Sequence, residues 1–215
     1  VRNPRGMWAC SNPDCCGASG ASADRMIGRL YSTPLSACMS CGSRVLELLY
    51  CYECGDISLG GFIADAKNDD LLLSPGPVTE EQSGKLVFLR PATDFFWYRP
   101  GVPKDSAKPW TKDGVQLAFR PTSWNPGLGL ANINPRKATG VSLHVAGGTA
   151  KEDRIPALPD RCPTCGYTSR AKTNFRAGEI FSPIRGHAGG PTAAIQLYLS
   201  QLVRCLAVGK TGRDA

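Results

Sequence analysis

The chain has 215 residues, a formal net charge of +7 and a hydrophobic share of 42%, with 24 glycines, 17 prolines and ten cysteines. This composition is typical of a folded globular protein and excludes a largely disordered one. No apolar stretch approaches the roughly 20 residues that cross a bilayer, and no signal peptide opens the sequence, so we expect a cytoplasmic protein without a membrane partner. Because the first residue is Val1, we expect the chain to be processed or cut from a longer protein.

Residues 1–64 form a cysteine-rich region, which we expect to fold as short strands between metal-binding turns. The apolar run Val45–Tyr50 and the run Ile57–Ala64 predict two paired strands of a ribbon. The tip of this ribbon then carries the cysteine pair Cys51 and Cys54. The sequence therefore predicts a zinc-knuckle region at this end of the chain.

Eight of the ten cysteines fall into four close pairs, and three of these pairs have the spacing Cys-x-x-Cys-Gly. Such a turn directs two sulfurs to one point, and the glycine adopts the positive φ that completes the turn. Redox Cys-x-x-Cys motifs occur singly beside a βαβ pattern, and disulfide-rich secreted domains are shorter, so we predict metal binding instead. The eight predicted zinc ligands are Cys10, Cys15, Cys38, Cys41, Cys51, Cys54, Cys162 and Cys165.

The stretch between Cys41 and Cys51 decides which pairs share a metal ion. As a strand, Val45–Tyr50 and its flanks separate the two middle pairs by about 25 to 30 Å, whereas sulfurs on one zinc ion lie within about 4 Å of one another. Sequence order then gives one zinc ion to the first two pairs and another to the last two, although 107 residues separate Cys54 from Cys162. An arrangement that joins the first pair to the third stays open. Neither site has a free ligand position, so we expect two structural zinc ions as cofactors.

Residues 65–150 are predicted to form a β-rich insertion. The sequence from 65 to 80 is polar and rich in proline and glycine, and we expect it to be an exposed loop. Four apolar segments bounded by proline or glycine then predict strands. These segments are Lys85–Arg90, Phe95–Tyr98, Val115–Arg120 and Val141–Val145.

Residues 151–190 contain the last cysteine pair and a basic loop. From residue 151 onward the chain has ten basic and five acidic residues. Clustered basic groups bind a polyanion by releasing its counterions, which favours DNA as a partner. In the alternative interpretation the charges form a solvated rim, Arg185 pairs with a carboxylate and His187 makes a structural hydrogen bond. The predicted nucleic-acid contacts are Arg170, Lys172, Arg176, Arg185 and His187.

Residues 191–215 are predicted to contain an amphipathic helix that leads to a following domain. Pro191 suits the first turn of such a helix, and Gly209 suits its end. The start of the helix offers free amides that favour an anion. Together the elements predict an α+β fold that is mostly β, with zinc-ribbon-like knuckles, a β-rich middle region and a C-terminal helix.

A complete catalytic centre is absent from the sequence. Gly209–Thr211 imitates the end of a phosphate-binding loop, but Arg204 replaces the glycine required five positions earlier and a predicted helix precedes it instead of a strand. His144 and His187 belong to no zinc-hydrolase or deaminase motif. Cys16 and Cys205 have no identifiable partner base and are expected to be spare thiols. A stand-alone enzyme is therefore the least favoured hypothesis, and ATP hydrolysis by the isolated chain would test it.

Four segments of the sequence carry a resemblance to a known family: Gly6–Cys15, Ile27–Tyr31, Cys38–Gly61 and Phe181–His187. They resemble the cysteine-rich region of large superfamily-2 DEAD/DEAH-box helicases, which include bacterial repair-type helicases and antiphage helicases such as those of DISARM or Druantia. The β-rich middle of the chain shares hardly any of this resemblance. The resemblance implies that the eight paired cysteines hold structural zinc beside motor lobes that bind ATP and translocate on DNA.

The function that this resemblance implies is that of a zinc-stabilised accessory region of a superfamily-2 DNA helicase or translocase, and antiphage defence is one pathway in which such proteins act. Its partners would be DNA, the motor lobes of the same protein and other defence-system subunits, and ATP would bind only to the parent motor domains. The alternative is a non-enzymatic zinc-ribbon module that holds a protein partner. Exposure of the aromatic run Phe95–Tyr98 in one surface patch would favour that alternative.

Overall fold

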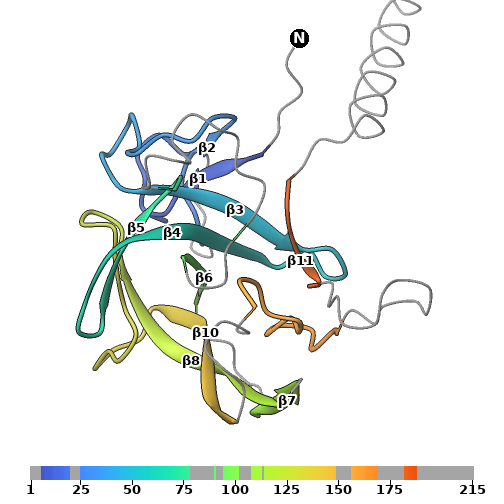
Figure 1. Cartoon of the computed structure of the whole chain (residues 1–215). Coiled ribbons are helices and arrows are strands. Elements are labelled where there is room, and N and C mark those ends of the chain that lie inside the picture. Colours follow the sequence, from blue (N-terminus) through green and yellow to red (C-terminus); the bar gives the residue numbers. More distant parts are fainter. Residues whose placement is uncertain are drawn as a thin grey trace, which may run out of the picture.

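The structure is a computed structural model, which describes residues 6–19, 25–77, 90, 94–101, 108–112, 114–148, 156–168 and 182–187. Within these ranges the chain is β-rich and contains no helix (Figure 1). In particular, this part of the chain has no helix long and apolar enough to span a membrane. The expected helix in residues 191–215 and nearly all of the expected strand at 85–90 lie outside the described residues.

Eleven strands within the described ranges make up one continuous antiparallel sheet. They are β1 (Trp8–Cys10), β2 (Leu30–Tyr31), β3 (Val45–Cys51), β4 (Ile57–Lys67), β5 (Asp70–Ser74), β6 (Phe95–Pro100), β7 (Trp110–Lys112), β8 (Val115–Asn125), β9 (Leu130–Asn132), β10 (Gly140–Gly148) and β11 (Ile184–Gly186). The strands predicted within β3, β4, β6, β8 and β10 are confirmed. The boundary predicted between residues 64 and 65 falls inside β4, which runs through both regions.

Six of the strands close into a ring in the order β4-β5-β9-β8-β10-β6, and β6 pairs again with β4. The long pairing of β8 with β10 forms one side of the ring, from Gly140 opposite Thr122 to Gly148 opposite Val115. Closure removes the free edges that an open sheet would leave. The ring is therefore the scaffold from which the other described strands extend.

The remaining sheet extends from the ring through β3, which pairs with the first half of β4. On its other edge, β3 pairs with β1 through Val45 to Glu47 and with β11 through Leu49 to Cys51. Two strands more than 170 positions apart in the sequence thus lie end to end along one edge of β3 (Figure 1). This arrangement places both ends of β3 next to cysteine-bearing segments.

The prediction of an exposed loop at residues 65–80 is wrong for the first half of that range. The chain instead continues β4 to Lys67, turns through two residues and returns as β5, with Lys67 opposite Asp70. Asn68 has a φ of 54°, which is the left-handed conformation that a tight two-residue hairpin requires. The adjacent Asn68 and Asp69 are the turn signal that identifies this hairpin, because both residue types tolerate that conformation.

The aromatic run of β6 lies in the protein core. Phe95, Phe96, Trp97 and Tyr98 are between 2% and 9% exposed. Phe95 and Trp97 pack into a cluster with Phe119, whereas Phe96 and Tyr98 pack on the other face of the strand. A continuous apolar run is what a strand covered on both faces requires. These side chains are therefore not available to a protein partner.

Candidate metal centres

The eight paired cysteines lie in two groups of four at opposite ends of β3. The N-terminal tetrad contains Cys10, Cys15, Cys38 and Cys41, and the C-terminal tetrad contains Cys51, Cys54, Cys162 and Cys165. Within each tetrad, the four sulfurs lie within 4.8 Å of one another. The extended strand between the tetrads keeps them apart, as the sequence predicts, and the open alternative that joined the first cysteine pair to the third is wrong.

The N-terminal tetrad joins the end of β1 to the segment before β3. Cys10 is the last residue of β1, and its Sγ lies 3.6 Å from Sγ of Cys41. The Sγ atoms of Cys15 and Cys38 are also 3.6 Å apart. All except Cys41 are buried, and the hydroxyl of Tyr31 lies 3.1 Å from Sγ of Cys38. This tyrosine, which sequence reasoning missed, supports the tetrad from the neighbouring β2.

The C-terminal tetrad joins the end of β3 to a segment that follows the ring. Sγ of Cys51 lies 4.0 Å from Sγ of Cys165, and Sγ of Cys54 lies 3.8 Å from Sγ of Cys162. Cys51 and Cys162 are buried, whereas Cys54 and Cys165 are exposed. Since 107 residues separate the two pairs, the shared site closes a very long loop and constrains the chain strongly.

The three Cys-x-x-Cys-Gly turns share one backbone pattern. In each turn the glycine N–H donates to the carbonyl of the first cysteine, as Gly42 does to Cys38 at 2.9 Å. The N–H of the first cysteine in turn donates to the carbonyl of the residue after the glycine. The glycines have φ values between 69° and 77°, where a side chain would be strained. The repeated geometry explains why the motif requires glycine at this position. The three glycines are Gly42, Gly55 and Gly166.

The thiols differ in how readily they become thiolates. Burial raises the pKa of Cys10 and of Cys162 well above the usual thiol value. Burial acts in the same direction on Cys38, but hydrogen bonds from the Tyr31 hydroxyl and from backbone amides outweigh it and lower its pKa to about 6. Four thiolates so close together repel one another, and a divalent cation at their centre is the group that stabilises them.

The donor geometry fits a tetrahedral metal ion and not disulfides. A tetrahedron with metal–sulfur bonds of about 2.3 Å has edges of about 3.8 Å, and the sulfur pairs above are 3.6 to 4.0 Å apart. A disulfide needs about 2.05 Å, and all nine described cysteines are free thiols. Each tetrad uses four protein ligands, which leaves no position for a substrate or an activated water. Cys16 belongs to neither tetrad, and Cys205 lies outside the described residues.

Of the five predicted nucleic-acid contacts, the structure describes Arg185 and His187. Arg185, on β11, is exposed, and its guanidinium lies 4.4 Å from the ring centroid of Tyr52. No ion pair of Arg185 occurs within the described ranges, so the alternative pairing with a carboxylate is not observed there. His187 stacks on Tyr50 at 4.5 Å, and burial lowers its pKa. The remaining three lie outside the described residues: Arg170, Lys172 and Arg176.

An ion pair ties the C-terminal tetrad to the ring, and sequence reasoning missed it. Asp56 follows the Cys-x-x-Cys-Gly turn, and its backbone carbonyl accepts the N–H of Cys51. Its carboxylate accepts two hydrogen bonds from Arg99 on β6, at 2.9 and 3.0 Å. The side chains are 8% and 12% exposed, so the pair is largely shielded from water.

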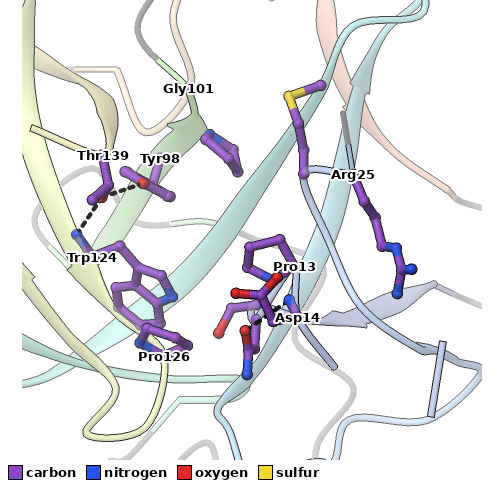
Figure 2. Close-up of a pocket in the computed structure, with 12 residues that line it drawn as sticks. Pro13, Asp14, Arg25, Tyr98, Gly101, Trp124, Pro126 and Thr139 are labelled. Atoms are coloured by element: carbon purple, nitrogen blue, oxygen red, sulfur yellow. Dashed lines mark hydrogen bonds between the residues drawn. The ribbon is translucent and has the colours of Figure 1, made fainter. Parts of the chain in front are cut away.

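A cavity of about 420 Å³ lies between the N-terminal tetrad loop and the ring (Figure 2). Its ring side carries Tyr98 and Trp124, and its loop side carries Asp14 and Arg25. The Tyr98 hydroxyl hydrogen-bonds with Thr139, and burial raises its pKa to about 12. A group that stays protonated at neutral pH cannot act as a general base. Tyr98 is therefore a packing residue of the cavity wall and not a base.

Comparison with known proteins gives a family match. The family model described as the YjiV N-terminal domain matches residues 30–185, which include β2 to β10 and six of the eight paired cysteines. A search of curated proteins found no match, and neither did a search of solved structures. Because the family model covers well over half of the sequence, the chain belongs to the YjiV N-terminal domain family.

Proposed function

We propose that this chain is a zinc-stabilised accessory region of a superfamily-2 DNA helicase or translocase, in which the cysteine turns act as zinc-ribbon-like knuckles. It would contribute nucleic-acid binding and a surface for the motor lobes of the parent protein, which would bind ATP. The observation that carries the proposal is the pair of closed four-cysteine sites at the two ends of β3. Sites of this kind stabilise a fold and perform no chemistry of their own.

Zinc is the metal that the donor set favours. Four thiolates in a tetrahedral arrangement suit Zn²⁺ or an iron–sulfur centre, and structural zinc is the usual occupant of paired Cys-x-x-Cys turns. We propose one Zn²⁺ in each tetrad. The resemblance of the cysteine-rich segments to superfamily-2 helicases also favours structural zinc, and it supports a place in antiphage defence.

Metal analysis of the purified chain tests the cofactor. We expect two zinc ions per chain, since each tetrad offers one complete site. A thiol-modifying reagent should release both ions, and a colorimetric indicator would count them. A visible absorption band from iron, or a content near one ion per chain, would contradict the assignment.

DNA binding is expected to depend on the basic residues beyond the last cysteine pair. Replacing Arg170, Lys172 and Arg176 together by glutamine should make the negative slope of log K against log salt for duplex DNA shallower by about 2 to 3, because each phosphate contact contributes about 0.9 to its magnitude. Anisotropy titrations at several salt concentrations would measure the slope.

A matched control removes three exposed charges from another part of the molecule, and it should leave the slope close to that of the original chain. An unchanged slope in the first triple variant would remove the DNA-binding role. The control residues are Lys67, Arg136 and Lys137.

The alternative function, a zinc-ribbon module that holds a protein partner, gains no support from the aromatic run of β6. The aromatic run of β6 is buried on both faces of the strand. A partner-binding role would therefore need a different surface. We retain the accessory region of a helicase as the favoured function.

A further inference from the structure

The C-terminal tetrad is bordered by a surface of aromatic and basic side chains that its metal-binding role does not use. We call it the Tyr/Arg surface. None of its members is fully buried, and Arg185 is exposed. Its members are Tyr50, Tyr52, Tyr167, Arg185 and His187.

Strand pairing and ring contacts place four of these side chains on one face of the sheet. Tyr50 is the direct cross-strand partner of Arg185. Tyr52 and His187 follow directly after β3 and β11, and their contacts with Arg185 and Tyr50 put them on the same side as that pair. The fifth member, Tyr167, comes from the last cysteine turn and accepts a hydrogen bond of 3.1 Å from the Tyr52 hydroxyl.

The side chains form two neighbouring stacks. In one, the guanidinium of Arg185 lies 4.4 Å from the ring centroid of Tyr52. In the other, the rings of His187 and Tyr50 lie 4.5 Å apart, tilted by 32°. Tyr167 meets Tyr52 edge to face, with centroids 5.5 Å apart. Each ring is thereby held in place before any ligand arrives, which lowers the entropy cost of binding.

We propose that the Tyr/Arg surface binds two adjacent, unstacked bases of a single-stranded nucleic acid, with Arg185 and His187 as the outer stacking layers. This inference rests on the proposed function and adds the strand preference to it. Arginine planes and aromatic rings are the groups on which proteins stack bases that have left a duplex. Arg185 also supplies a cation for the backbone phosphate.

The spacing of the surface favours a single strand over a duplex. Tyr52 directly follows β3, and its N–H continues the pairing by donating to the carbonyl of Pro183. The two-residue step from Tyr50 to Tyr52 spans about 6.6 Å of extended chain. Bases stacked in a duplex are about 3.4 Å apart, so the two stacks fit bases that have separated from each other. The exposed Glu53 opposes binding of a nucleic acid here, because its negative charge repels phosphate. Its carboxylate lies near enough to Tyr167 to act on the pKa of that hydroxyl in the raising direction.

Anisotropy titrations of the full metal-loaded chain test the proposal, with a fluorescein-labelled 12-nucleotide single strand and a duplex of the same length. We expect tighter binding of the single strand. Tyr52→Leu should weaken that binding about tenfold or more while leaving the salt slope unchanged, because stacking carries no counterion release. Arg185→Gln should weaken it and reduce the magnitude of the salt slope by about 0.7, the value for one phosphate on a single strand. Glu53→Gln should strengthen it.

Arg29→Gln is the matched control, because Arg29 is also exposed and lies 5.7 Å from the ring centroid of Tyr31 beside the other tetrad. We expect this control to keep the preference for the single strand. Zinc content and melting temperature establish that each variant is folded, and the exposed Arg185 offers a second test if Tyr52→Leu loses metal. If the chain bound both oligonucleotides with equal affinity, and the variants bound them as tightly as the original chain, the stacking surface would be wrong while the DNA-binding role would stand. No binding of either oligonucleotide would overturn the DNA-binding role as well.

Discussion

Cys54→Ser is expected to reduce the bound metal from two ions to one and to lower the melting temperature by at least about 6 °C. Structural zinc contributes roughly 10 to 16 kcal/mol in small zinc domains, and the variant loses the whole contribution of its ion, so we expect it to cost more than about 3 kcal/mol. For a chain of this length 1 kcal/mol corresponds to about 2 to 4 °C. Cys54 is exposed, so the variant removes a ligand without leaving a cavity in the core.

The control for this experiment is Cys16→Ser. Cys16 is also an exposed free thiol, and it belongs to neither tetrad. Its replacement should leave both metal ions bound and shift the melting temperature by no more than 1 or 2 °C, as is usual for surface substitutions worth about 0.5 kcal/mol. Equal metal content in Cys54→Ser and the original chain would show that the C-terminal tetrad is not a metal site.

Asp56→Ala should lower the free energy of unfolding by about 3 to 5 kcal/mol, because it leaves the charge of Arg99 shielded from water without its partner. The carboxylate accepts two hydrogen bonds from that guanidinium, and both side chains are at most 12% exposed. Urea denaturation monitored by tryptophan fluorescence would measure the change.

Two further variants distinguish the cost of an unpaired, shielded charge from a general effect of substitution on stability. Asp65→Ala removes the acidic partner of Lys67 in a pair whose side chains are 53% and 81% exposed, and it should cost about 1 kcal/mol or less. The double variant Asp56→Ala with Arg99→Met should recover most of the loss, since no unpartnered charge remains. A loss as large in Asp65→Ala as in Asp56→Ala would contradict this account.

The eight cysteines and the favoured pairing of the tetrads could be predicted from the sequence because their signals are local, although one alternative pairing stayed open. Each Cys-x-x-Cys-Gly turn is complete within five residues, and the apolar run Val45–Tyr50 needs only its length and composition to exclude a shared site for the pairs on either side. The strands β6, β8 and β10 could be predicted equally well, because each is an apolar segment bounded by proline or glycine. The Asn68–Asp69 hairpin could also have been found, since its turn residues are adjacent in the sequence.

The closure of the ring could not be predicted, because it depends on contacts between distant segments. β9 and β11 have three residues each, too few to show a period, and they form strands only because β8 and β3 offer them an edge. The bond between Asp56 and Arg99 joins positions 43 apart and has no pattern of its own. The Tyr/Arg surface likewise exists only where β11 lies beside β3.

The two tetrads differ in when they can form during synthesis. The N-terminal tetrad joins Cys10 to Cys41, 31 positions apart, whereas the C-terminal tetrad joins Cys51 to Cys165, 114 positions apart. Since contacts close in sequence form faster and domains begin to fold on the ribosome, the first site is complete while the strands of the ring are still being made. Cys51 and Cys54 must wait until the last cysteine turn emerges. Metal binding at the second tetrad would therefore require that the ring has been synthesised in full, and a chain that stops early keeps Cys51 and Cys54 without their partner ligands.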